Sequence, residues 1–216
     1  MSNERRGDDY ESAMRELRSS YEEQKGAIRA RLDEFRNVPS EEYFYEMCFC
    51  LCTPQSKARH ALLVVEKLKE IDFQSYPCDV ADILGNSEHY IRFHRQKSYN
   101  LQEMQSKWSS IEKIIASDVP ISEKRDHLAA SVRGMGMKEA AHFLRNIGIY
   151  GVAILDRHIL KHLTRLRVIS EYPMSLSRSL YREIEDEWLK FCRQTGIPME
   201  EMDLLFWSME TGEILK

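Results

Sequence analysis

Lys138 and Asp156 stand 18 positions apart in this chain, each at the expected start of a helix. Lys138 follows two glycines in the stretch GMGMKEAAHFLRNIG, residues 134–148. An ammonium group is unfavourable there, because the unpaired amide N–H groups of a helix start carry partial positive charge. A neutral amine, in contrast, is a nucleophile, so a lysine at this position indicates a catalytic role. Asp156 opens the next helical pattern, DRHILKHLTRL, as a good N-cap.

The segment between these two residues is short enough to bring them together. The helix expected over residues 137–147 rises about 16 Å at ~1.5 Å per residue, and residues 148–155 span at most ~26 Å when extended. If the apolar run GVAIL folds back along this helix, Lys138 and Asp156 meet in one cleft. The sequence permits this return but does not require it.

An amine beside a carboxylate in such a cleft suits the removal of a base from a deoxynucleotide. A neutral lysine can attack the anomeric carbon, expel the base and hold the sugar as a Schiff base, from which β-elimination nicks the strand. The carboxylate would stabilise the positive charge that develops on the sugar and help to deprotonate the amine, as carboxylates do in glycoside hydrolysis.

The glycines before Lys138 define the element that must position it. An apolar helix, the turn Gly134-Met135-Gly136 and a second apolar helix form the pattern of a helix-hairpin-helix. The glycines allow backbone angles that other residues resist, and they let a phosphate approach the amides at the start of the second helix. The same pattern also occurs as an ordinary tight connection between helices.

Basic residues flank this hairpin and favour DNA as its partner. Arg133–Arg167 holds seven basic residues against two acidic ones, although the whole chain has a net charge of −4. Concentrated basic charge is typical of phosphate binding, and a solvated helix face would look similar. We expect Arg133 and Arg157 to contact DNA. His142 and Arg145, on the same helix face as Lys138, are expected to form a solvated, phosphate-facing surface.

The periodicity of the 216 residues predicts an all-α protein, because no run of alternating β-branched residues stands between turn signals. We expect two helical domains flanking a cleft, residues 1–42 with 151–216, and residues 43–150 ending in the helix-hairpin-helix. The sequence leaves open whether the polar first helix packs on the fold or recruits a partner. The expected helices cover residues 9–36, 43–51, a stretch from Thr53-Pro54 through Leu68, and residues 79–85, 87–93, 95–117 and 122–132.

Several classes of protein and site are excluded by composition. The opening residues contain no apolar signal core, and no apolar run is long enough to span a bilayer, so we expect a cytoplasmic, nucleoid-associated monomer without membrane contact. The five cysteines match neither a zinc site nor an iron–sulfur cluster, so we expect reduced thiols and neither a metal nor a cofactor. Cys48, Cys50 and Cys52 are predicted to be buried on one helix.

Together, GMGMKEAAHFLRNIG and VAILDRHILKHL closely resemble the helix-hairpin-helix DNA glycosylases. Within that superfamily, LCTPQSKA (51–58), IRFHRQK (91–97) and the ending LLFWSMETGEILK resemble the second family of 8-oxoguanine DNA glycosylases, found in archaea and some bacteria. The resemblance implies a bifunctional glycosylase and apurinic-site lyase of base excision repair. Its partner would be double-stranded DNA containing oxidised guanine, with the damaged base flipped into the interdomain cleft.

The resemblance also assigns roles to individual residues. Lys138 matches the family nucleophile and Asp156 the catalytic carboxylate. Phe93 and Trp207 match aromatics that hold the flipped base, although aromatics in apolar stretches more often belong to the core. Lys216, the last residue, matches a C-terminal lysine implicated in base recognition. Gln55 lies in the loop expected near the lesion strand.

Two questions stay open at this point. 8-Oxoguanine carries a hydrogen on N7 where guanine has a lone pair, so a buried acceptor would favour the lesion. The terminal carboxylate of Lys216 or a backbone carbonyl could be that acceptor. The alternative to an enzyme is a non-catalytic helix-hairpin-helix module that binds DNA and recruits a partner. Such a module would need Gly134, Gly136 and the basic residues, but no lysine–aspartate pair.

Overall fold

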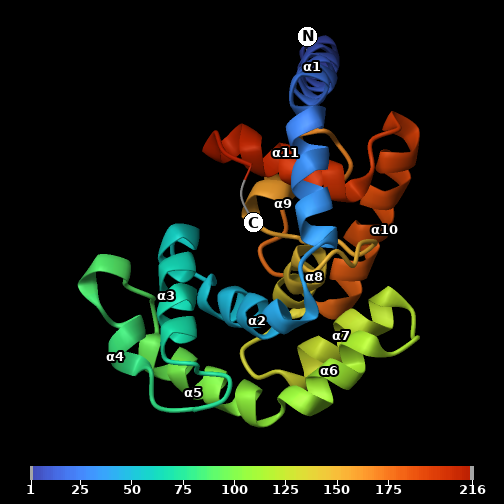
Figure 1. Ribbon diagram of the computed structural model, residues 1–216. Helices are drawn as coiled ribbons and strands as arrows, with labels where there is room; N and C mark the ends of the chain where they lie inside the picture. The colour runs from blue at the N-terminus through green and yellow to red at the C-terminus, as the bar shows by residue number, and fades with distance from the viewer. Residues whose placement is uncertain (1, 215–216) are drawn as a thin grey trace. The chain divides into compact units, whose positions relative to one another are not determined.

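The computed structural model describes residues 2–214, and every regular element in this range is a helix (Figure 1). The prediction of an all-α fold is therefore confirmed for these residues. Contacts group the chain into two compact units. Arg36–Tyr150 forms one unit, and the stretch up to Phe35 forms the other together with the stretch from Gly151 onward. The sequence-based division into domains stays a prediction, because a compact unit need not fold independently.

The unit Arg36–Tyr150 is built around one buried helix, α2 (Tyr43–Cys52). This helix packs against α3, α5 and α8, and seven of its ten residues are buried hydrophobic side chains. Such all-round burial explains the apolar composition of α2. The other elements are η1 (Ser40–Glu42), α3 (Ala58–Glu70), α4 (Ala81–Leu84), η2 (Ser87–His89), α5 (His94–Ser106), α6 (Trp108–Ala116), α7 (Ile121–Ser131) and α8 (Met137–Asn146).

The cysteines of α2 are buried, as the sequence predicts. Cys48, Cys50 and Cys52 are all fully inaccessible to solvent. Burial raises the pKa of the Cys52 thiol to about 12 and that of Cys48 well above its ordinary value. Both side chains therefore remain thiols at neutral pH and serve as small apolar residues of the core.

The other unit contains the long first helix, α1 (Ser2–Arg36), and the three last helices of the chain. These are α9 (Arg157–Arg165), α10 (Arg178–Thr195) and α11 (Met199–Thr211). The buried side of α1 consists of Ala13, Leu17, Tyr21, Ile28, Leu32 and Phe35. The polar first helix is thus a packed part of the fold over this range, which answers a question that the sequence leaves open.

Polar contacts fix α1 on α11 at two places. The Tyr21 hydroxyl donates to Glu201 Oε2 at 2.6 Å, and Arg29 Nε donates to the same oxygen at 3.1 Å. About two turns further along α11, Ser208 Oγ donates to Gln24 Oε1 at 2.6 Å. The two hydrogen bonds from Tyr21 and Arg29 compensate the burial of Glu201, a residue that is 8% exposed.

The expected helix start at Thr53-Pro54 is wrong, because α3 begins at Ala58. Thr53 instead closes α2: its hydroxyl donates to the Cys50 carbonyl at 3.0 Å, and its amide donates to Phe49 O at the same distance. Residues 53–57 form a turn, in which Ser56 N donates to Thr53 O. The helix expected over 95–117 is likewise divided, with a break at Lys107 between α5 and α6. Of the helix expected over 87–93, only the 3-10 turn η2 forms.

Candidate functional site

The turn between α7 and α8 requires glycine at its first position. Gly134 has a φ of +83°, and a Cβ atom added there would lie 2.3 Å from Asn100 Nδ2. Gly136 has extended backbone, and its amide donates to Glu139 Oε2 at 3.1 Å. Met135 between the glycines is buried, so the turn is anchored on the core while both glycines are exposed. The helix-hairpin-helix predicted from the sequence is present.

Lys138 lies in the first turn of α8, as predicted, and its side chain is 30% exposed. Its Nζ atom lies 3.0 Å from Glu139 Oε1. Glu139 therefore contacts both the lysine and the Gly136 amide, which supplies negative charge at the positive end of the helix. The sequence analysis missed this role of Glu139, although a glutamate three residues after an N-cap is a known capping signal.

Asp156 is the N-cap of α9, also as predicted. Its Oδ1 atom accepts hydrogen bonds from His158 N at 2.8 Å and Ile159 N at 2.9 Å. Both bonds use the same oxygen, so the orientation of the carboxylate is fixed without engaging Oδ2 in the cap. The side chain is half-buried.

The apolar run before Asp156 is held by α10. The Ala153 amide donates to Glu185 Oε1 at 2.5 Å, and Tyr181 Oη donates to Ala153 O at 2.6 Å. Leu155 N in turn donates to Tyr181 Oη at 3.2 Å. This segment gives Asp156 a rigid support within its own unit. Lys138 belongs to the other unit, so the pairing of the two side chains in one cleft stays a prediction.

Gln55 and Phe93 share an unusual backbone. Both are non-glycine residues in the left-handed region, with φ values of 56° and 60°. Phe93 precedes α5 and is 52% exposed, so the alternative that it belongs to the core is wrong. The Arg92 guanidinium lies 4.8 Å from its ring centre. Exposed side chains on strained backbone are often found at functional sites.

Trp207 lies on α11 and is partly exposed, whereas most of its neighbours on that helix are buried. The His158 ring meets its indole edge to face, with 5.3 Å between the ring centres. His158 also lies 3.6 Å from Glu210, which accepts hydrogen bonds from Lys161 Nζ at 2.7 and 2.9 Å. The hydrogen bond from Lys161 holds the pKa of the Glu210 carboxyl below its ordinary value, so the His158 ring that contacts Trp207 also faces a carboxylate at neutral pH. Lys216 lies outside the described residues.

The two arginines expected to bind DNA are both exposed. Arg133 lies with its guanidinium 4.8 Å from the centre of the Tyr99 ring and 3.7 Å from Glu103. Arg157 Nε donates to His158 Nε2 at 3.1 Å. The aromatic partner of Arg133 was not anticipated, because no short-range pattern connects residues 34 positions apart.

The expectation for His142 and Arg145 is wrong. Arg145 is buried, with 7% exposure, and His142 is half-buried with its ring 5.8 Å from that of Phe49. The physical reason is that α2 packs against this side of α8. It covers a helix face that was expected to be solvated because its residues are polar. Lys138, one turn before His142, has a side chain that is 30% exposed.

The sequence analysis also missed Lys97, whose ammonium group is buried on α5. Its residue exposure is 6%, and its Nζ atom donates to Cys52 O and Pro54 O, each at 2.7 Å. Burial lowers the pKa of Lys97 to about 8. A lysine in a polar helix is ordinarily exposed, so only the three-dimensional contacts identify it.

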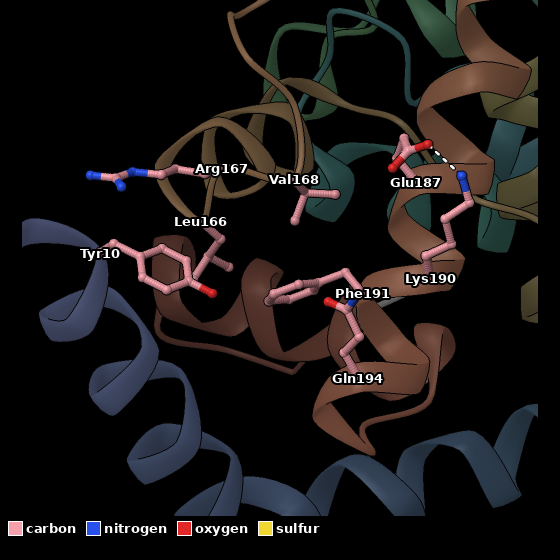
Figure 2. A pocket seen from close by; sticks show the side chains of 8 residues that line it. All are labelled: Tyr10, Leu166, Arg167, Val168, Glu187, Lys190, Phe191 and Gln194. Atoms are coloured by element: carbon pink, nitrogen blue, oxygen red, sulfur yellow. Dashed lines mark hydrogen bonds and ion pairs between the residues drawn. The ribbon is translucent and has the colours of Figure 1, made fainter. Parts of the chain in front are cut away.

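A hollow of about 370 Å³ lies away from these residues, in the unit that contains α1. Figure 2 shows the rings of Tyr10 and Phe191 pointing toward the same space, near the ion pair between Lys190 and Glu187. None of the residues expected to do chemistry lines it. Within residues 2–214, no group of three histidine, cysteine or acidic side chains is arranged to hold a metal ion. No helix in that range is long and apolar enough to cross a membrane.

Comparison with known proteins identifies close relatives over nearly the full length. The family model described as 8-oxoguanine DNA glycosylase matches residues 28–197. A protein of Fusobacterium nucleatum named 8-oxoguanine DNA glycosylase/AP lyase is 38% identical over 213 residues, which cover 93% of this chain and 96% of that protein.

Solved structures agree with this match. The crystal structure of Methanocaldococcus jannaschii 8-oxoguanine DNA glycosylase superposes with a TM-score of 0.84 at 29% identity, covering 96% of this chain and 99% of the other. A second structure from the same organism contains 15mer DNA with 8-oxoguanine. It superposes with a TM-score of 0.81 at 30% identity and covers 92% of this chain and 98% of that one.

Proposed function

Because the chain belongs to the 8-oxoguanine DNA glycosylase family, we propose that it excises 8-oxoguanine from double-stranded DNA and then nicks the strand, with Lys138 as the nucleophile and Asp156 as the catalytic carboxylate. The observation that carries this proposal is the position of Lys138, an accessible lysine in the first turn after the helix-hairpin-helix glycines. A hairpin that only bound DNA backbone would need its glycines and basic residues, but it would not need a lysine that acts together with an aspartate.

The reaction follows from the amine. Neutral Lys138 attacks C1′ of the damaged nucleotide, a C–N bond forms, and the glycosidic bond breaks as the base leaves with a proton. The C1′–O4′ bond then breaks, O4′ takes up the remaining proton of the attacking amine, and C1′ and Lys138 become joined as an imine. Loss of a C2′ proton breaks the bond to the 3′ oxygen, and hydrolysis of the imine frees the enzyme. Asp156 stabilises the positive charge on the sugar in the first step.

The N-cap geometry suits Asp156 for this role. Its two amide partners hold Oδ1 in place. A positioned carboxylate interacts most strongly with charge that develops in the transition state, because it needs no reorganisation. The second oxygen is available for the sugar or for the amine.

DNA binding and base recognition complete the proposal. Gly134 and Gly136 admit a phosphate to the start of α8, and Arg133 and Arg157 neutralise neighbouring phosphates. Gln55 contacts the strands where the lesion is extruded. The flipped base is held by the aromatic rings of Phe93 and Trp207 together with Lys216.

Trapping with borohydride tests Lys138. On duplex DNA with one 8-oxoguanine, the wild-type chain should give a covalent protein–DNA adduct, because borohydride reduces the imine to a stable amine. Lys138→Gln should give none. Lys113→Gln, which removes an exposed lysine of α6, is the matched control and should trap like the wild type. Equal adduct from Lys138→Gln and the wild type would exclude Lys138 as the nucleophile and leave a DNA-binding module.

A separate variant tests Asp156. Asparagine keeps the oxygen that accepts from His158 N and Ile159 N, so Asp156→Asn should retain the helix start and DNA binding while excision falls by about 10²-fold or more. Single-turnover excision and gel-shift binding measure the two properties. Loss of binding with unchanged chemistry on bound DNA would show instead that Asp156 is only a cap.

A further inference from the structure

The buried ammonium of Lys97 is satisfied entirely by one loop. Its three N–H donors match three oxygens, Cys52 O and Pro54 O at 2.7 Å and Ser56 Oγ at 3.4 Å. All three acceptors lie within residues 52–56, the connection between α2 and α3 that carries Gln55. The lysine side chain thus ties this loop to α5.

The same network reaches the segment that carries Phe93. Ser56 Oγ accepts a hydrogen bond from the Arg92 amide at 3.0 Å, and Lys97 N donates to Phe93 O at 2.9 Å. Lys97 and Ser56 therefore join the loop of Gln55 to the residues just before α5. Two segments about forty positions apart in the chain share one hydrogen-bonded junction.

Gln55 and Phe93 need such a junction, because each adopts an unfavourable backbone conformation. A left-handed φ at a non-glycine residue is unfavourable and persists only where the surroundings impose it. Both side chains are exposed, so their own packing does not hold them. The restraint comes from the neighbouring oxygens and amides that Lys97 and Ser56 engage.

Lys97 is unsuited to other roles in the reaction. With 6% exposure and all three donors directed at the loop, its amine does not reach a DNA sugar as Lys138 can. Burying an ammonium without a carboxylate partner is costly, and burial accordingly lowers the pKa of Lys97 to about 8. A methionine would fill the space without this cost. The three hydrogen bonds are therefore what the amine contributes.

We propose that Lys97 is a positioning residue, which holds Gln55 and Phe93 in the conformation that receives the flipped base. This inference rests on the proposed function, which places Gln55 where the lesion is extruded and Phe93 against the flipped base. It predicts that Lys97 is needed for the reaction on DNA that contains the damaged base. It should not be needed for the reaction at an abasic site, where the base is already absent.

The test compares two substrates with one variant. Lys97→Met removes the three hydrogen bonds and keeps the length of the side chain. Its single-turnover excision of 8-oxoguanine should fall about tenfold or more, because small displacements of positioning groups have effects of that size. Borohydride trapping on duplex DNA with a preformed abasic site should stay within about threefold of wild type, because Lys138 is retained and loses only its charge interaction with Lys97.

Every result decides the proposal. Loss of both activities to the same extent in a folded variant, or loss of neither, would overturn it. If Lys97→Met does not fold, Ser56→Ala decides, since it removes only the link between Lys97 and the Arg92 amide. Ser56→Ala should slow excision about threefold with unchanged abasic-site trapping, and unchanged excision would overturn the proposal. A wild-type chain inactive on both substrates would instead refute the proposed function.

Discussion

Gly134 combines two requirements at one residue, a left-handed backbone and the close approach of Asn100. Gly134→Ala should therefore lower the free energy of unfolding by ~1 to 3 kcal/mol and weaken DNA binding, because the hairpin must shift to admit the methyl group. Urea denaturation and a gel-shift assay measure the two effects.

Gly136→Ala is the matched control for this change. Its backbone is extended, and the added Cβ would meet only the end of the Glu139 side chain, at 3.0 Å. Its cost should be at most ~1 kcal/mol, the difference between glycine and alanine at an N-cap. Equal destabilisation by the two variants would show that the special backbone of Gly134 is not what the hairpin requires.

At the residue scale, sequence reasoning succeeds where a function is marked by local pattern. Glycine spacing and capping preference predict that Lys138 and Asp156 lie at helix starts. The structure confirms that Lys138 lies in the first turn of α8 and that Asp156 is the N-cap of α9. Lys97 leaves no such mark, because its acceptors are carbonyls of residues more than forty positions away. The burial of Arg145 has the same origin, since a neighbouring helix decides it.

At the element scale, the docking of α1 depends on a few buried polar contacts as well as on its apolar side. Tyr21→Phe removes the bond to Glu201 and leaves that carboxylate with Arg29 as its remaining partner here. A hydrogen bond to a charged group contributes more than one between neutral groups, so the variant should lose about 1 to 2 kcal/mol of unfolding free energy.

Tyr76→Phe controls for the loss of a hydroxyl group as such. Tyr76 is 72% exposed, and its variant should stay within about 0.5 kcal/mol of wild type in the same denaturation assay. Equal values for the two variants would mean that the contact between Tyr21 and Glu201 contributes nothing to the docking of α1.

The helices themselves follow from the sequence more readily than their boundaries. The long polar helix, the apolar α2 and the helices around the hairpin are marked by periodicity over many residues. The start of α3 is misread because Thr53-Pro54 fits a helix start, whereas the threonine completes the end of α2. Threonine hydroxyls bond to carbonyls as well as to amides, and only the packed structure decides between them.

At the scale of the whole molecule, the distribution of charge matters more than its sum. The chain carries 31 basic and 35 acidic residues, so overall attraction cannot account for DNA binding. Binding must come from local contacts with phosphates, each of which releases counterions. We propose that exposed arginines of the stretch Arg133–Arg167, Arg133 and Arg157, supply such contacts. Affinity should consequently fall steeply with salt.

Two variants that each remove one positive charge separate the effect of local charge on DNA binding from the effect of net charge. Arg133→Gln should weaken binding to damaged and undamaged duplexes alike and reduce the slope of log K against log salt by about 1, as expected for one lost phosphate contact. Lys190→Gln gives the same net charge, but Lys190 lies in the acidic last part of the chain and outside the basic stretch Arg133–Arg167, so its slope should match wild type. Fluorescence anisotropy at several salt concentrations measures both slopes. Equal slopes in the two variants would mean that net charge, and not the hairpin, governs the encounter with DNA.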